Sequence, residues 1–113
     1  MWYIFGTGWK KFSLDTTPDR TYKIGHAVSC DGINWTKEGS QIIADRLGTY
    51  ESQALPTVIE INGMYHMFFC YRHGLDFRDN KSRSYRIGYA SSFDLLSWQR
   101  DDSMVNLDIS EDG

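Results

Sequence analysis

Hydrophobic and aromatic residues come in short runs along this chain, and polar segments that contain glycine separate the runs. Short runs rich in aromatic and β-branched residues are typical of β-strands. Asp31-Gly32 and Asn62-Gly63 are dipeptides typical of tight hairpin turns. Pro56 stands among the first residues of one run, where a strand loses no backbone donor from its ladder. The pattern predicts strands over residues 1–7, 22–28, 35–38, 55–61, 64–71, 85–91 and 97–101.

The same pattern occurs twice in the chain. An offset of 63 residues aligns residues 1–39 with residues 64–102 without a gap, and ten of the 39 pairs are identical. Such an internal repeat indicates an array, a solenoid or a propeller. We therefore divide the chain into residues 1–46, which lack the first of four strands, and residues 47–113, which hold all four and a C-terminal connection. The identical pairs are Met1/Met64, Phe5/Phe68, Arg20/Arg83, Tyr22/Tyr85, Ile24/Ile87, Gly25/Gly88, Ala27/Ala90, Ser29/Ser92, Asp31/Asp94 and Trp35/Trp98.

The repeated unit predicts the fold class. A meander of four antiparallel strands, repeated with short turns, is the blade of a β-propeller. We expect an all-β protein with one complete blade and one blade that lacks its first strand. Alternate connections of a meander lie on opposite sides, so the long connections 40–54 and 72–84 share one side, here called the long-loop face. Because function is found preferentially on long loops over a rigid scaffold, the candidate site residues are Glu51, Gln53, Arg72, His73, Asp76, Arg78, Asp79 and Arg83.

Composition narrows the classes of function. The 113 residues carry 15 acidic and 12 basic side chains and no basic run, which argues against nucleic acid, because phosphate binding relies on clustered Lys and Arg. Cys30 and Cys70 lie at no metal-binding spacing, so we expect free thiols, no metal and no cofactor. No apolar run approaches the roughly 18 residues of a membrane span, and no signal peptide is seen. We expect no membrane partner and a cytoplasmic protein, or a secreted one if a leader has been removed.

Two stretches resemble a known group of enzymes. Leu-Pro-Thr-Val-Ile-Glu-Ile-Asn-Gly-Met-Tyr-His-Met-Phe-Phe, and Tyr-Arg-Ile-Gly-Tyr-Ala-Ser-Ser-Phe-Asp with Trp98 behind it, are similar to the five-bladed β-propeller glycosidases of glycoside hydrolase families 43 and 32, with the phosphorylases of family 130 as relatives. The resemblance covers about two blades, residues 1–109. It implies catalytic carboxylates around a central funnel, and Glu51 matches the place of one of them. Glycoside hydrolysis needs at least two, one to protonate the leaving oxygen and one to activate water or attack.

The repeat separates structural from functional candidates. Ser29, Asp31 and Trp35, with their copies at 92, 94 and 98, resemble a shortened Asp-box turn of sialidase-type propellers. We interpret them as scaffold, in which Asp accepts turn amides, Ser caps the turn and Trp fills the space between blades. Residues that are not repeated are the better functional candidates. We predict a catalytic role for Glu51, sugar or carboxylate binding by Arg72 and His73, substrate binding by Gln53 and Asp76, and stacking of a sugar on Trp9.

Two hypotheses of function remain open, and they differ in class. The first is part of a carbohydrate-active propeller, hydrolase-like, that acts on or binds a glycan at the long-loop face. The second is a non-catalytic module that self-associates and binds carbohydrate or nothing; an inert truncated product is a third reading. Because two blades cannot close a funnel, we expect the unpaired faces and edges to be covered by further copies or by the rest of a longer propeller.

Overall fold

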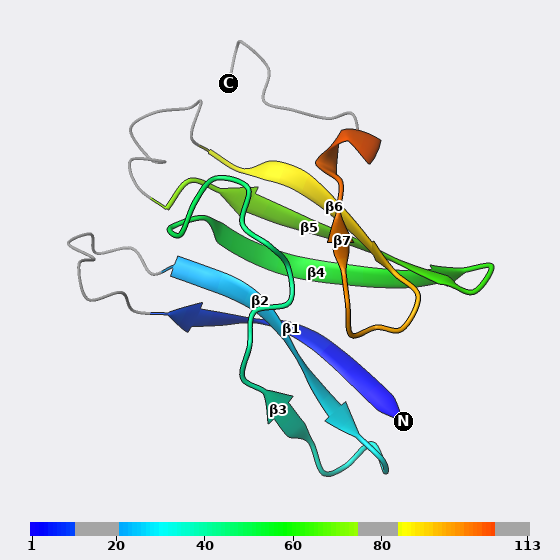
Figure 1. The fold of residues 1–113 in the computed structure, drawn as a ribbon. Coiled ribbons are helices and arrows are strands. Elements are labelled where there is room, and N and C mark those ends of the chain that lie inside the picture. The colour runs from blue at the N-terminus through cyan, green and yellow to red at the C-terminus, as the bar shows by residue number, and fades with distance from the viewer. Residues whose placement is uncertain (11–20, 75–83, 106–113) are drawn as a thin grey trace.

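The computed structural model describes residues 1–10, 21–74 and 84–105 and consists almost entirely of strands (Figure 1). A three-stranded sheet holds β1 (Trp2–Lys10), β2 (Thr21–Ser29) and β3 (Thr36–Glu38) in that order. A four-stranded sheet holds β4 (Ser52–Ile61), β5 (Met64–Arg72), β6 (Arg86–Ser92) and β7 (Gln99–Arg100), and a short 3-10 turn, η2 (Asp102–Met104), follows. Neighbouring strands are antiparallel. The predicted all-β class is confirmed, with one sheet complete and one sheet a strand short.

The repeat seen in the sequence is also a repeat in register. Phe5 faces His26 across β1 and β2, and the equivalent residues Phe68 and Tyr89 face each other across β5 and β6. β3 and β7 pair in the same way with the ends of β2 and β6. The offset of 63 residues therefore superimposes the first sheet on strands β5 to β7, and β4 is the strand that the first sheet lacks.

The boundaries of β4 differ from the prediction. The strand was expected to begin at Leu55 but begins at Ser52, and its pairing register shifts between Ala54 and Thr57. Pro56 has no N–H to give to the ladder, so the chain bulges there and pairing continues on both sides. Leu55 takes the bend with φ 56° and a side chain that is mostly exposed. At the other end of β4, Asn62 and Gly63 both have positive φ, as a tight hairpin turn requires.

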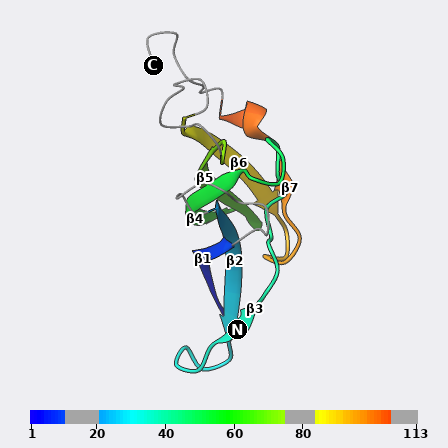
Figure 2. The same ribbon diagram turned by 90° about the vertical axis from the view of Figure 1, so that its left-hand side faces the viewer.

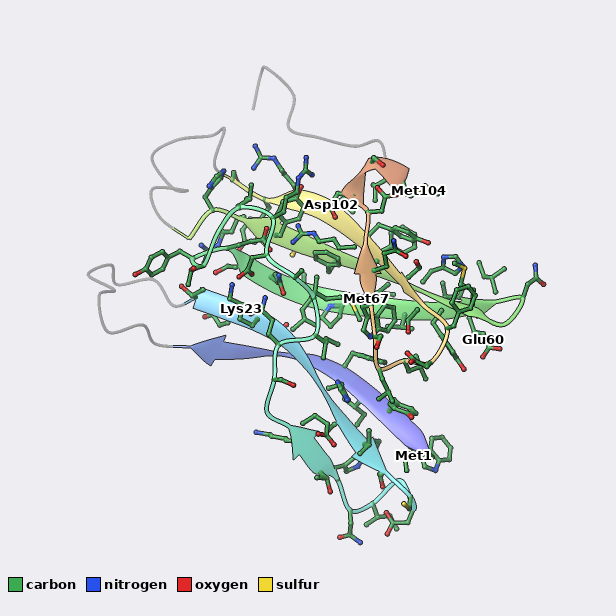
Figure 3. The ribbon with its side chains drawn as sticks, in the orientation of Figure 1. Met1, Lys23, Glu60, Met67, Asp102 and Met104 are labelled. Atoms are coloured by element: carbon green, nitrogen blue, oxygen red, sulfur yellow. The ribbon has the colours of Figure 1, made fainter. Side chains whose placement is uncertain are left out.

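The two sheets pack through one hydrophobic core. Its buried members are Ile24, Ile43, Met67, Phe69, Tyr71 and Ala90. Met67 lies at the centre of the molecule, and β4 runs beside β1 and β2 (Figures 1 and 3). Phe5 from the first sheet meets Trp98 from the second edge-on, with ring centroids 5.6 Å apart and planes at 89°. Seen from the side, the connection that rises from β3 lies on the same side of the molecule as β7 (Figure 2).

Side chains of β4 complete the edge of β2. The N–H of Tyr22 donates to Ser52 Oγ at 3.1 Å, and the N–H of Ile24 donates to Gln53 Oε1 at 3.5 Å. β3 pairs only with residues 26 to 28 of β2, so these two amides would otherwise lack acceptors within the sheet. An amide buried without a partner costs free energy comparable to a lost hydrogen bond. The second sheet therefore satisfies the backbone of the first.

The Asp-box-like turns have the structural role that we inferred from their repetition. Asp31 Oδ1 accepts the N–H groups of Asn34 and Ile33, both at 2.8 Å, and these hydrogen bonds lower the pKa of Asp31. Asp94 makes the same two contacts in the second copy. Trp98 fills the space between the sheets as expected, whereas Trp35 is 37% exposed and fills no space between them. No helix in the described part of the chain has the length and hydropathy needed to cross a bilayer.

Candidate functional site

The two long connections leave the four-stranded sheet at the same end, as the meander predicts. Ser52 pairs with Arg72, so Glu51 and His73 follow each other across the ends of β4 and β5. Gly74 lies so close to Tyr50 that a Cβ placed on it would overlap the carbonyl oxygen of Tyr50. Other candidates lie outside the described residues: Asp76, Arg78, Asp79 and Arg83, and the side chain of Trp9.

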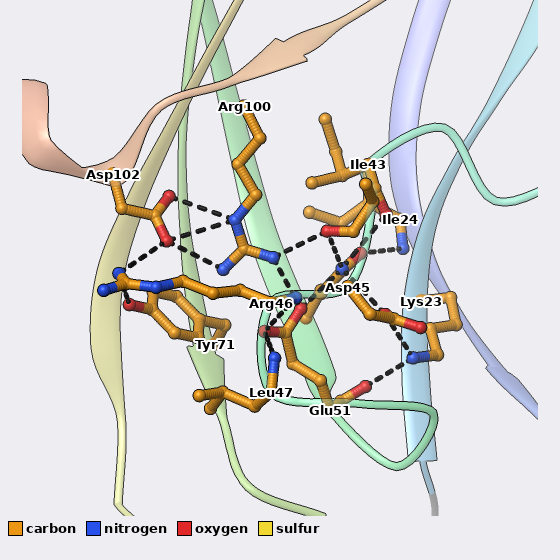
Figure 4. A network of polar contacts seen from close by, with 12 residues as sticks. Lys23, Ile24, Ile43, Asp45, Arg46, Leu47, Glu51, Tyr71, Arg100 and Asp102 are labelled. Atoms are coloured by element: carbon orange, nitrogen blue, oxygen red, sulfur yellow. Dashed lines mark hydrogen bonds and ion pairs between the residues drawn. The ribbon is translucent and has the colours of Figure 1, made fainter.

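Glu51 is fully buried, with 0% of its surface exposed, and both carboxylate oxygens are occupied (Figure 4). Oε1 accepts the backbone N–H groups of Arg46 and Leu47, each at 3.1 Å. Oε2 accepts Gln53 Nε2 at 2.8 Å and Arg100 Nη1 at 2.7 Å. In this geometry the carboxylate orders the connection before β4 and has no free oxygen to offer a ligand. Its catalytic role stays a prediction.

Arg100, on β7, is the cation that balances Glu51. Its side chain is 9% exposed, and its guanidinium also donates to the carbonyl of Ala44 at 2.6 Å and through Nε to Asp102 at 3.1 Å. The guanidinium lies 4.4 Å from the centroid of the Tyr71 ring. Burial lowers the pKa of Arg100, but its hydrogen bonds to Asp102 and Glu51 outweigh burial and raise it. Arg100 therefore stays charged and lies between two carboxylates.

Asp102 extends the network toward solvent. It accepts the N–H of Tyr89 at 3.1 Å and Nη1 of Arg46 at 3.1 Å. Burial raises the pKa of Asp102, yet the hydrogen bonds from Arg100 and Tyr89 bring it below its ordinary value. The side chain of Arg46 is 58% exposed, and the hydroxyl of Tyr71 accepts a second bond from its Nη1 at 2.9 Å. Arg46 is thus a solvent-facing cation held in one direction by two fixed partners.

Gln53 and Lys23 connect this network to the first sheet. Gln53 is fully buried and donates to the carbonyl of Ile43 as well as to Glu51. Lys23, from β2, donates to Asp45 at 2.7 Å and to the carbonyl of Glu51 at 2.7 Å. We predicted Gln53 as a substrate-binding residue; in the described structure its contacts are with the protein itself, and the binding role stays a prediction.

Arg72 and His73 occupy the end of β5. Arg72 is buried; its Nε donates to the hydroxyl of Tyr85 at 3.2 Å and its Nη1 to the carbonyl of His73 at 3.0 Å. The guanidinium also lies 5.6 Å from the centroid of the Tyr85 ring. These contacts fix Arg72 against the strand that follows it. Sugar binding by Arg72 and His73 stays a prediction.

A polar hollow of about 430 Å³ opens where the network meets solvent, and we call it the arginine hollow. It is lined by Ala44, Asp45, Arg46, Arg100, Asp101, Asp102 and Ser103. Sequence reasoning did not single out Arg46, Arg100 or Asp102. A signal was present for two of them, because Arg100 and Asp102 align with Lys37 and Gly39 in the other copy and so are not repeated. Among the described residues, no three His, Cys, Asp or Glu side chains gather as a metal site would require.

Sequence comparison places the chain beside longer proteins. Uncharacterised proteins from two strains of Mycobacterium tuberculosis, CDC 1551 and H37Rv, are each 32% identical over 113 residues, which is 99% of this chain and 33% of theirs. The 1,2-beta-oligomannan phosphorylase of Thermoanaerobacter sp. X514 is 31% identical over 80 residues, which is 69% of this chain and 25% of that enzyme. No protein-family model matches the chain. The chain spans about a third or less of the length of these curated relatives.

Structural comparison agrees with the sequence. A solved glycoside hydrolase superimposes with a TM-score of 0.63 and 18% identity over 87% of this chain and 26% of the hydrolase. A second solved structure, that of a BT0996 RGII complex, matches with the same TM-score, identity and coverage. At this identity the likeness concerns the fold. The chain therefore shares the fold of part of a glycoside hydrolase and has distant sequence similarity to an oligomannan phosphorylase.

Proposed function

We propose that this chain is part of a carbohydrate-active β-propeller and binds a glycan at the arginine hollow. The observation that carries the proposal is the set of non-repeated polar residues that the fold collects at this one place. Binding sites usually hold a few precisely placed polar groups that fix the orientation of the ligand. Arg46, held by Tyr71 and Asp102, is such a group. Its N–H donors and the hydroxyl of Ser103 suit the hydroxyl groups of a sugar.

The relatives suggest which glycan to try first. The related phosphorylase is named for 1,2-linked β-oligomannan, and the matching structure is a glycoside hydrolase. We extend this chemistry to the present chain as a proposal, since the chain covers only 25% to 33% of the relatives that it matches in sequence. β-1,2-linked manno-oligosaccharides are therefore the first probe, and other β-linked oligosaccharides provide the comparison.

The second candidate is a non-catalytic module, and the burial of Glu51 favours it. A general acid must reach the glycosidic oxygen, and hydrolysis needs a second carboxylate on the other side of the bond. Glu51 is wholly buried and receives four hydrogen bonds. Binding without turnover is the function that this geometry supports in the chain by itself.

Calorimetric titration of the chain with β-1,2-mannotriose tests the proposal. We expect Arg46→Ala to weaken binding by roughly 10-fold or more, because a hydrogen bond to a charged group contributes about 1.5–3 kcal/mol. Lys37→Ala is the matched control: it also removes one exposed cation, but Lys37 does not line the arginine hollow. Binding that is unaffected by Arg46→Ala would place the site elsewhere, and no binding of any oligosaccharide would refute the proposal.

Turnover separates the two candidates. If the chain releases sugar from the oligosaccharide and Glu51→Gln abolishes release while the protein stays folded, the catalytic prediction is supported. Binding without release supports the non-catalytic module. Circular dichroism of each variant shows whether a lost signal reflects chemistry or unfolding.

A further inference from the structure

The contact between the two sheets is a template for a contact between two copies of the protein. Phe5 on the first sheet meets Trp98 on the second. Each of these residues has an identical copy at the offset of 63 residues, Phe68 for Phe5 and Trp35 for Trp98. Phe68 is 42% exposed and Trp35 is 37% exposed. Both halves of the contact thus occur a second time, and neither copy takes part in the packing between the sheets.

Phe68 belongs to an apolar patch on the outer face of the four-stranded sheet. Side chains alternate along a strand, and Met67, Phe69 and Tyr71 point into the core, so Phe68 points outward. Ladder partners place further exposed apolar residues on the same face, each 43% to 51% exposed. Contiguous exposed apolar surface of this kind marks interaction sites. The outer patch consists of Ile59, Ile61, Phe68 and Ile87.

The outer face of the three-stranded sheet offers the opposite shape. Phe5 points toward the second sheet, so Ile4 and Gly6 point away from it. A pocket of about 360 Å³ lies on this face, and its lining includes Ile4, Gly6, Gly8, Gly25 and Ala27. We call it the glycine pocket.

The repeat explains why this pocket is empty. The residues equivalent to Ile4, Gly6 and Gly8 in the second sheet are Met67, Phe69 and Tyr71, whose large side chains fill the core against the first sheet. The glycine pocket is therefore the position at which a preceding sheet would pack, with small residues in place of large ones. Side chains from outside can occupy the space that the glycines leave.

We propose that the protein associates head to tail with a second copy, the outer patch of one copy packing into the glycine pocket and against Trp35 of the next. The two surfaces lie on opposite faces of the molecule, so the contact is heterologous and joins further copies into a ring or an open filament. The contact would repeat the arrangement that already joins the two sheets within one molecule. This proposal does not depend on glycan binding.

The test is the solution mass of variants on each surface, measured by size exclusion with light scattering. We expect the wild type to be larger than a monomer, and Phe68→Glu and Trp35→Glu each to block assembly. The decisive step is to mix the two variants. Each keeps one intact surface, so the mixture should form a one-to-one dimer that neither variant forms alone.

Controls keep the result interpretable. Phe93→Glu changes the same residue type in an exposed turn, at 78% exposure, and should leave the wild-type mass unchanged. Ile59→Glu repeats the test of the patch if Phe68→Glu, whose ring contacts Tyr89, fails to fold by circular dichroism. A monomeric wild type, an oligomer that survives Trp35→Glu, or a mixture without heterodimer would each overturn the proposal.

Discussion

Replacing Glu51 with alanine tests whether the buried network stabilises the fold. The change leaves Arg100, 9% exposed, with one carboxylate partner instead of two, and it removes the acceptor of two backbone amides. Breaking a buried ion pair from one side costs about 3–5 kcal/mol. Because Asp102 still balances Arg100, we expect the lower end, about 3 kcal/mol, which is a large part of the roughly 5–15 kcal/mol that stabilises a domain.

Urea unfolding followed by tryptophan fluorescence measures this loss. With a slope of about 1–3 kcal/mol per molar urea, the midpoint should fall by about 1–3 M. Glu51→Gln keeps one oxygen for the amides and should cost less than alanine. Glu60→Gln is the control, since Glu60 lies exposed on the same strand near its far end and should change stability by less than about 0.5 kcal/mol (Figure 3).

The size of the effect decides whether the reasoning holds. A loss below about 1 kcal/mol for Glu51→Ala is what an exposed ion pair would give, and it would show that the network is solvated rather than buried. A double-mutant cycle with Arg100→Met isolates the pair itself. If the two losses simply add, Glu51 and Arg100 do not interact.

Three further changes test other parts of the fold. Because the pKa of Asp102 lies below its ordinary 3.8, its contribution is complete above that value and is lost as pH falls through the folded pKa; the stability gap to Asp102→Asn, measured in urea, should narrow from about pH 5 to about pH 2. Gly74→Ala should cost about 2 kcal/mol or more, because its Cβ would overlap the carbonyl oxygen of Tyr50, whereas Gly39→Ala meets open space. Leu55→Gly should raise the thermal midpoint, since relief of the strain at φ 56° is worth roughly 1 kcal/mol and the exposed side chain loses little burial.

Each of these predictions has an outcome that contradicts it. A gap that stays constant from about pH 5 to about pH 2 would mean that Asp102 titrates alike in the folded and unfolded chains. Equal stability of Gly74→Ala and Gly39→Ala would show that the chain at residue 74 moves freely away from residue 50. A lower midpoint for Leu55→Gly would show that the entropy lost by glycine on folding exceeds the backbone strain.

Local signals in the sequence were enough to predict the fold but not the site. Strands and turns depend on neighbouring residues, so alternation, Asn62-Gly63 and the repeat predicted both sheets. The network depends on contacts far apart in the sequence: Arg46 reaches Asp102 across 56 residues and Arg100 reaches Glu51 across 49. No local pattern encodes such pairs. Glu51 was found by its position before β4, yet its complete burial follows only from the packing of the connection around it.

The bonds that Ser52 and Gln53 make to the edge of β2 bear on how the chain folds. Repeats that contact only their neighbours often unfold one at a time, because each satisfies its own backbone. Here the amides of Tyr22 and Ile24 are satisfied by side chains of the other repeat. Neither sheet reaches its lowest free energy until both have formed, so the two repeats constitute one cooperative unit. Hydrogen exchange at these two amides should then proceed only through global unfolding.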